Sequence, residues 1–144
     1  MSLAMLDRTL QTVPFLAALG IRAEETRTGH VVLRLPYNQK VTNHTGALHT
    51  AAIFAVGELA AAVVLGTHPD LANLVHLQKS TKVKYYLPSS KDVTAHATLT
   101  EENMAAIKSS IGSGHATTEI TVKVLDGHGK DVAELSSHFA FRQR

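Results

Sequence analysis

Residues 43–66 read NHTGALHTAAIFAVGELAAAVVLG, and this stretch decides the fold. From Ala51 to Gly66 every residue is apolar or glycine except Glu58. A helix that is apolar on all sides must be enclosed by other parts of the protein. The run is shorter than the roughly 20 apolar residues that cross a bilayer, and a charge at mid-membrane is costly. We therefore predict a central helix over about residues 47–66, buried in a soluble protein.

The segments around this helix favour β-strands, because β-branched and aromatic residues gather there between turn signals such as Thr28-Gly29 and the DGHG of residues 126–129. We expect strands over residues 21–27, 30–36, 74–87, 92–100, 115–125 and 130–142. Thr100 is expected to cap a short helix over residues 101–111 that ends at Gly112. Residues 1–19 are expected to form a short N-terminal helical segment.

This order of elements predicts an α+β fold in one domain spanning residues 1–144. An antiparallel sheet of five to six strands can wrap around one helix, but it covers only part of the helix surface. We therefore expect a second copy of the chain to cover the open side. The protein is then a homodimer, or a dimer of such dimers.

The composition narrows the classes of function. The 144 residues include no cysteine, which excludes disulfides, thiolate nucleophiles and cysteine-based zinc sites. A net charge of +2 is too small to indicate a nucleic-acid partner. Residues 1–20 lack the basic start of a secretory signal, and the nine histidines show no convincing metal-ligand spacing. We expect a cytoplasmic protein with no nucleic-acid or membrane partner, no metal and no cofactor.

Glu58 is the candidate for chemistry. Burying an ionised carboxylate without partners is costly, so an unneeded glutamate is disfavoured in the middle of an apolar helix. Burial also raises a carboxyl pKa, which suits general-base work near neutral pH. The first turn of a helix that begins near Ala47 would expose free N–H groups at its positive end. Such groups can hold the negative charge that develops on a carbonyl oxygen under attack.

The same stretch resembles a known family. Asn43, Gly46, His49 and Glu58 match a pattern of the hotdog-fold acyl-CoA thioesterases, particularly the phenylacetyl-CoA thioesterase-like branch. The YYLPSS of residues 85–90 and the last hairpin, residues 124–141, are similar to the family as well. The resemblance covers about residues 20–142. It implies a hotdog fold, in which an antiparallel sheet wraps around one long helix.

The resemblance implies hydrolysis of an acyl-CoA thioester and a role for each matched residue. Glu58 would activate a water molecule or attack the thioester directly, and the sequence leaves both routes open. The backbone N–H of Thr50 would hold the oxyanion. Asn43 would position the water or the carboxylate, and His49 would orient the loop through hydrogen bonds.

The resemblance also suggests residues that bind the substrate. Gly46 belongs to the matched loop. Gln78 and Ser80 fall where the family often has a polar group from the neighbouring chain. Lys82 and Lys84 project from one side of the predicted strand and could meet the phosphates of coenzyme A.

The spacing of Thr50 and Glu58 predicts a shared site. They are eight residues apart, which is about 12 Å along one helix and too far for both to serve one carbonyl carbon. Two such helices packed antiparallel about a twofold axis would bring residue 50 of one chain near Glu58 of the other. We therefore predict two sites per dimer, each built from both subunits.

Three other readings remain. Glu58 can be a structural residue, and Asn43 a turn residue. The family has two glycines where this chain has Thr50 and Ala51, so the protein can also be an acyl-CoA-binding module without turnover. A hydratase of the same fold would want an aspartate and a histidine paired on the loop, for which Asn43 and His44 are a poor substitute.

Overall fold

The computed structural model describes residues 1–114 and 116–144. Six strands form one antiparallel sheet in the order β1-β2-β4-β5-β6-β3. The strands are β1 (Arg22–Arg27), β2 (His30–Leu35), β3 (Leu74–Tyr85), β4 (Val93–Thr98), β5 (Ala116–Leu125) and β6 (Asp131–Gln143). The helices are α1 (Leu3–Thr12), α2 (Pro14–Leu19), α3 (Thr50–Leu65) and α4 (Glu101–Ile111), with 3-10 turns η1 (Gln39–Val41) and η2 (Pro69–Leu71).

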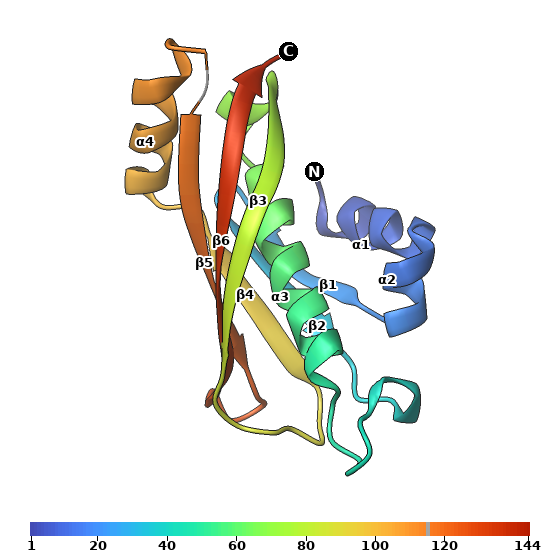
Figure 1. The fold of residues 1–144 in the computed structure, drawn as a ribbon. Helices are drawn as coiled ribbons and strands as arrows, with labels where there is room; N and C mark the ends of the chain where they lie inside the picture. The colour runs from blue at the N-terminus through green and yellow to red at the C-terminus, as the bar shows by residue number, and fades with distance from the viewer. Residues whose placement is uncertain (115) are drawn as a thin grey trace.

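The long helix α3 lies against one face of the sheet, as predicted (Figure 1). Its packed side is fully apolar, with Ile53, Val56 and Ala60 buried in the core. Gly57 allows the closest approach, because a Cβ atom at this position would lie 2.5 Å from a methyl carbon of Leu135 on β6. The helix and sheet therefore meet at a distance that only glycine permits.

The strands show why only one face of the sheet is covered. Along β5, buried and exposed residues alternate, and Ile120, Val122 and Val124 are fully buried on the side of α3. The residues between them are exposed. This alternation of period two is typical of an antiparallel sheet with one face on the core and one in water. The predicted strands are confirmed, while His115, which the sequence assigned to the start of β5, lies outside the described residues.

The central helix begins later than predicted. Residues 47–49 lie outside α3, which starts at Thr50 because His49 has extended backbone angles and caps the helix. Leu48 belongs to the preceding loop, where its N–H donates to the Ser89 carbonyl at 2.8 Å. The predicted start near Ala47 is therefore wrong by about one turn. The predicted end is confirmed to within a residue.

The shorter helices follow their sequence signals. α4 begins with a capping box in which Thr100 and Asn103 bond to each other's backbone N–H, and it ends at Gly112. α1 packs over β1, where the Asp7 carboxylate accepts hydrogen bonds from Arg22 and from the Ala23 N–H. Among the described residues, none of the helices has both the length and the apolar character to span a bilayer.

The two edges of the sheet differ. β1 forms one edge, beside α1, whereas β3 forms the other with one side of its backbone unpaired in the single chain. β3 is twelve residues long, and Leu77 on it is 60% exposed. Proteins usually protect so long an edge, because it can pair with a strand of another chain.

Candidate active site

Glu58 lies on the face of α3 that the sheet leaves open. This open face follows helical spacing through Ala51, Phe54, Glu58 and Ala62, none of which is fully buried. The Glu58 side chain is half-buried and makes no hydrogen bond or ion pair with any described residue. A carboxylate in this state is available to a water molecule or a substrate.

The first turn of α3 leaves one N–H group free. His49 Nδ1 accepts a hydrogen bond from the Ala51 N–H at 3.0 Å, and the His49 carbonyl accepts from Ala52 and Ile53. The Thr50 N–H donates to no described residue. This free donor stands at the positive end of a sixteen-residue helix, where a developing negative charge is stabilised.

Asn43 shapes the loop that leads into α3. Its Oδ1 accepts hydrogen bonds from the Thr45 N–H at 2.9 Å, from the Thr45 hydroxyl at 2.8 Å and from the Ala47 N–H at 3.2 Å. Gly46 completes the turn with a φ of 83°, and its carbonyl accepts from the Tyr37 hydroxyl at 2.6 Å. The Asn43 oxygen is thus held by the loop, whereas its Nδ2 donates to none of residues 1–114 and 116–144.

The residues predicted on β3 separate onto two faces. A β-bulge between Gln78 and Ser80 shifts the alternation of the strand, so that Gln78 and Thr81 point to the same side. There Gln78 Nε2 donates to Thr81 Oγ1 at 2.6 Å and to the fully buried Ser137 at 3.2 Å. Sequence analysis missed Thr81 and Ser137, although Ser137 stands out as a polar residue in the alternation of buried apolar residues Ala133, Leu135, Phe139 and Phe141 along β6.

Ser80, Lys82 and Lys84 project to the other side of the sheet, away from α3. All three are exposed. Gln78 and Ser80 therefore do not share one surface within a chain. Lys82 and Lys84 do share one, as their spacing predicts.

Within one chain, the loop and the helix start bring Asn43, Gly46, His49 and Thr50 together. Glu58 is two turns further along α3, about 12 Å from Thr50. On the β3 side, the Tyr85 hydroxyl reaches the Thr50 carbonyl at 3.4 Å, and burial raises the pKa of Tyr85. Glu58 and the Thr50 N–H are therefore not brought together within one chain.

Two pockets lie beside these groups, and a third lies elsewhere. One of about 920 Å³ lies beside the loop before α3 and includes Tyr37, Ser89, Lys91 and His128 in its lining. A smaller one of about 180 Å³ lies along the far half of α3. Within the described residues, no three His, Cys, Asp or Glu side chains gather as metal ligands would.

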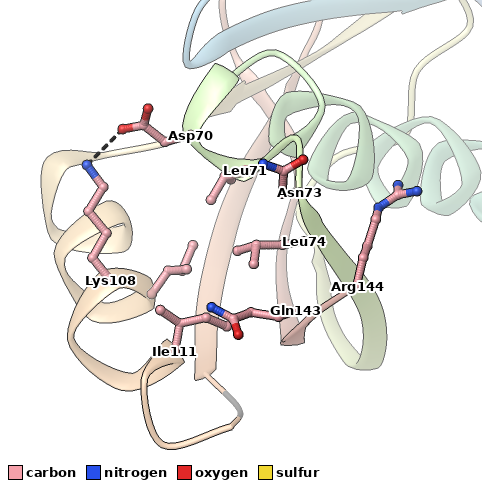
Figure 2. Close-up of a pocket in the computed structure, with 9 residues that line it drawn as sticks. Asp70, Leu71, Asn73, Leu74, Lys108, Ile111, Gln143 and Arg144 are labelled. Carbon is pink, nitrogen blue, oxygen red and sulfur yellow. Dashed lines mark ion pairs between the residues drawn. The ribbon is translucent and has the colours of Figure 1, made fainter.

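The third pocket lies apart from the predicted residues. Its volume is about 530 Å³, and it is bounded by η2, α4 and the ends of β3 and β6 (Figure 2). The Lys108 ammonium and the Asp70 carboxylate pair across its rim at 2.8 Å, and this pairing lowers the pKa of Asp70. Leu71, Leu74 and Ile111 supply apolar lining. Asp70 and Lys108 pair with each other, and Arg144 is a further charged residue of the lining.

Comparisons with known proteins support the fold. The model of a family described as a domain of unknown function, DUF4442, matches residues 4–140. A protein of unknown function from Pseudomonas aeruginosa, described as a probable thioesterase, superposes with a TM-score of 0.90 at 24% identity, over 100% of this chain and 97% of that one. A thioesterase from Haemophilus influenzae superposes with a TM-score of 0.78 at 14% identity, over 99% and 92%. The curated proteins include no match.

A third similar protein comes from Staphylococcus aureus, and one of its two structures is described as that of a thioesterase enzyme. Its structures superpose with a TM-score of 0.71 at 18% and 19% identity, over 90% and 89% of this chain and 99% and 98% of theirs. One structure carries a glutamate-to-alanine change and the other a glutamine-to-alanine change, 15 positions apart. At such identities these likenesses establish the fold, and the predicted hotdog fold is confirmed.

Proposed function

The chain belongs to the DUF4442 family and has the hotdog fold, and from this premise we propose that it hydrolyses acyl-CoA thioesters. Water adds to the carbonyl carbon, the C–S bond breaks, and the products are a free acid and coenzyme A. One observation carries the proposal. A carboxylate without a partner, Glu58, shares the open side of α3 with a free N–H donor at Thr50.

Glu58 supplies the reactive group. It either takes a proton from the attacking water or adds to the carbonyl itself, giving an anhydride that water then hydrolyses. Its half-exposed position and lack of intramolecular partners fit either route. The thioesterase names of similar structures add support at the level of reaction class.

The Thr50 N–H supplies the oxyanion site. As the carbonyl carbon becomes tetrahedral, negative charge gathers on its oxygen, and a fixed N–H at a helix start stabilises it. The threonine side chain leaves this N–H in place. His49 is a positioning residue, because its ring holds the neighbouring Ala51 N–H and fixes the first turn of α3.

Asn43 positions the water or the carboxylate through its free Nδ2. Asn43 and Glu58 are 15 residues apart. The same separation relates the glutamine and the glutamate that were changed in the Staphylococcus aureus thioesterase. An amide and a carboxylate at this spacing, on the same fold, support a shared task for the pair.

A homodimer completes the site. The unpaired edge of β3 and the exposed Leu77 support pairing of two β3 strands about a twofold axis. The two α3 helices then run antiparallel, and Glu58 of one subunit meets the Thr50 N–H of the other. Because the two groups then come from different subunits, their separation of about 12 Å along one helix no longer keeps them apart.

The coenzyme A part of the bound substrate extends from the site at the loop end of α3. The pocket of about 920 Å³ falls within the usual range for ligand sites, about 300–1,000 Å³. Two of its lining residues, Tyr37 and Ser89, bond to the loop that carries Asn43 and Gly46. Lys82 and Lys84 on the outer face of β3 supply positive charge for phosphates, as does Lys91 in the pocket, where Asp92 and Asp126 also lie.

A second candidate function is acyl-CoA binding without turnover. It is favoured by the first turn of α3, where the His49 ring accepts the hydrogen bond of the Ala51 N–H and, among the described residues, the Thr50 N–H is left without an acceptor. The test is to measure both binding and release with a panel of short, medium, long and aromatic acyl-CoAs. We expect release of free CoA at a rate proportional to enzyme. Binding without release would select the second function.

A further inference from the structure

A small apolar cavity lies between α1, β1 and the C-terminal half of α3. Its volume is about 180 Å³, and none of its lining side chains is charged. They are Met1, Leu6, Thr26, Ala62, Val63, Gly66 and Thr67. Side chains of this kind offer little to phosphates or carboxylates and favour a hydrocarbon.

The Thr67 hydroxyl in this lining is already engaged within the protein. The Thr67 hydroxyl donates to the Val64 carbonyl at 2.6 Å and accepts from the Gly29 N–H at 2.8 Å. Its hydrogen-bonding capacity is thus directed into the protein. A hydrocarbon can therefore fill the space without leaving this hydroxyl unsatisfied.

The cavity adjoins the proposed reaction centre along one helix face. Ala62 lines the cavity and is four residues after Glu58, so the two side chains are neighbours on the open face of α3. The cavity lies toward β1, whereas the proposed dimer contact uses β3 at the opposite edge of the sheet.

The volume of the cavity indicates the length of the acyl chain that it can hold. A cavity of about 150 Å³ with an apolar lining holds benzene, so this one holds about six carbons. The step from Glu58 to Ala62 spans about 5–6 Å, which takes about four more carbons. We infer that the cavity binds the end of the substrate's acyl chain, and that the substrate is a straight aliphatic chain on the order of ten carbons. This inference rests on the proposed thioester hydrolysis.

Ala62→Phe tests the inference, because a benzyl group at this position fills the mouth of the cavity. We expect wild type to prefer decanoyl-CoA over butanoyl-CoA in kcat/KM, and Ala62→Phe to lower that ratio at least about tenfold. Val63→Ala enlarges the cavity, so the acyl-chain length that gives the highest kcat/KM should increase. The matched control is Ala105→Phe, the same change at an exposed alanine of α4, which should leave the ratio unchanged.

Thermal unfolding checks that each variant is folded, and Ala62→Leu replaces Ala62→Phe if the larger residue is not tolerated. A chain-length ratio that stays the same in the folded Ala62 variant would overturn the inference. If wild type releases no CoA, the proposed function fails instead. The cavity is then tested by the dissociation constants of decanoyl-CoA and butanoyl-CoA, where an Ala62 variant without effect on their ratio would overturn it.

Discussion

His49 Nδ1 accepts the Ala51 N–H at 3.0 Å and leaves the Thr50 N–H between them without an acceptor. Thr50 is the first residue of α3, and proline is well tolerated at this helix position because its missing N–H would have had no partner. The preceding His49 has the extended backbone that a residue before proline requires. The proposed oxyanion donor can therefore be deleted without breaking the helix.

Thr50→Pro should lower kcat for acyl-CoA hydrolysis by about 100-fold or more, as loss of one oxyanion donor does elsewhere. Thr50→Ala keeps the N–H and should retain activity within about threefold of wild type. Steady-state kinetics on both variants, with circular dichroism to confirm helix content, make the comparison. Equal losses in the two variants would assign the effect to the side chain and contradict an oxyanion role for the N–H.

His49 should also contribute to stability as the cap of α3. Loss of an N-terminal cap costs about 0.5–2 kcal/mol, so His49→Ala should lower the free energy of unfolding by that amount. His49→Asn supplies another cap acceptor and should recover most of the loss. Urea denaturation measures all three proteins. If His49→Asn lowers the free energy of unfolding as much as His49→Ala does, the ring stabilises the protein through packing and not through the cap.

Gly57→Ala should destabilise the fold by about 1–3 kcal/mol, because the new methyl group overpacks against Leu135. Gly112→Ala is the control: a Cβ there meets nothing within 4 Å, and its backbone is right-handed helical. We expect thermal denaturation to separate the two variants by several degrees. A Gly57→Ala variant as stable as wild type would show that α3 can move away from β6 at little cost.

The attachment of α1 to β1 should depend on pH. Hydrogen bonds from Arg22 and the Ala23 N–H lower the pKa of Asp7 to about 2, from an ordinary 3.8. Because the folded state lowers this pKa, the stabilisation is present above about pH 4 and is lost as the pH falls toward 2. Asp7→Asn should therefore be less stable than wild type at pH 7, with the difference shrinking toward pH 2. Asp131→Asn is the control, and a pH-independent difference at Asp7 would contradict the account.

Most of the fold could be predicted because its signals are local. Turn residues mark the hairpins, and Thr100 and Gly112 mark the ends of α4. The start of α3 could not be predicted from the sequence, since histidine is an uncommon N-cap residue and the preceding Ala47 and Leu48 are residue types that favour helices. The loop around Asn43 took the shape of an ordinary turn, and its hydrogen bonds still leave the amide nitrogen available.

The bulge in β3 had no sequence signal. Lys79 is not a glycine, and the resemblance that suggested Gln78 and Ser80 did not indicate that they lie on two faces of the sheet. Hydrogen-bond partners far apart in the sequence could not be predicted either. The hydrogen bond from Gln78 to Ser137, for example, joins residues 59 positions apart. The cavity beside Ala62 likewise depends on where α1 and β1 lie relative to α3, which no local pattern gives.

The central claim is that Glu58 of one subunit works with the Thr50 N–H of the other, and mixed dimers test it most directly. Glu58→Gln and Thr50→Pro should each lower CoA release by about 100-fold, or about 2.7 kcal/mol of barrier. Mixing the two inactive proteins under conditions that exchange subunits creates heterodimers in which one of the two sites has both groups intact. Activity should then recover to about a quarter of wild type, because half of the dimers are mixed and each has one good site. Two inactive variants that stay inactive after verified exchange would contradict a site shared between subunits.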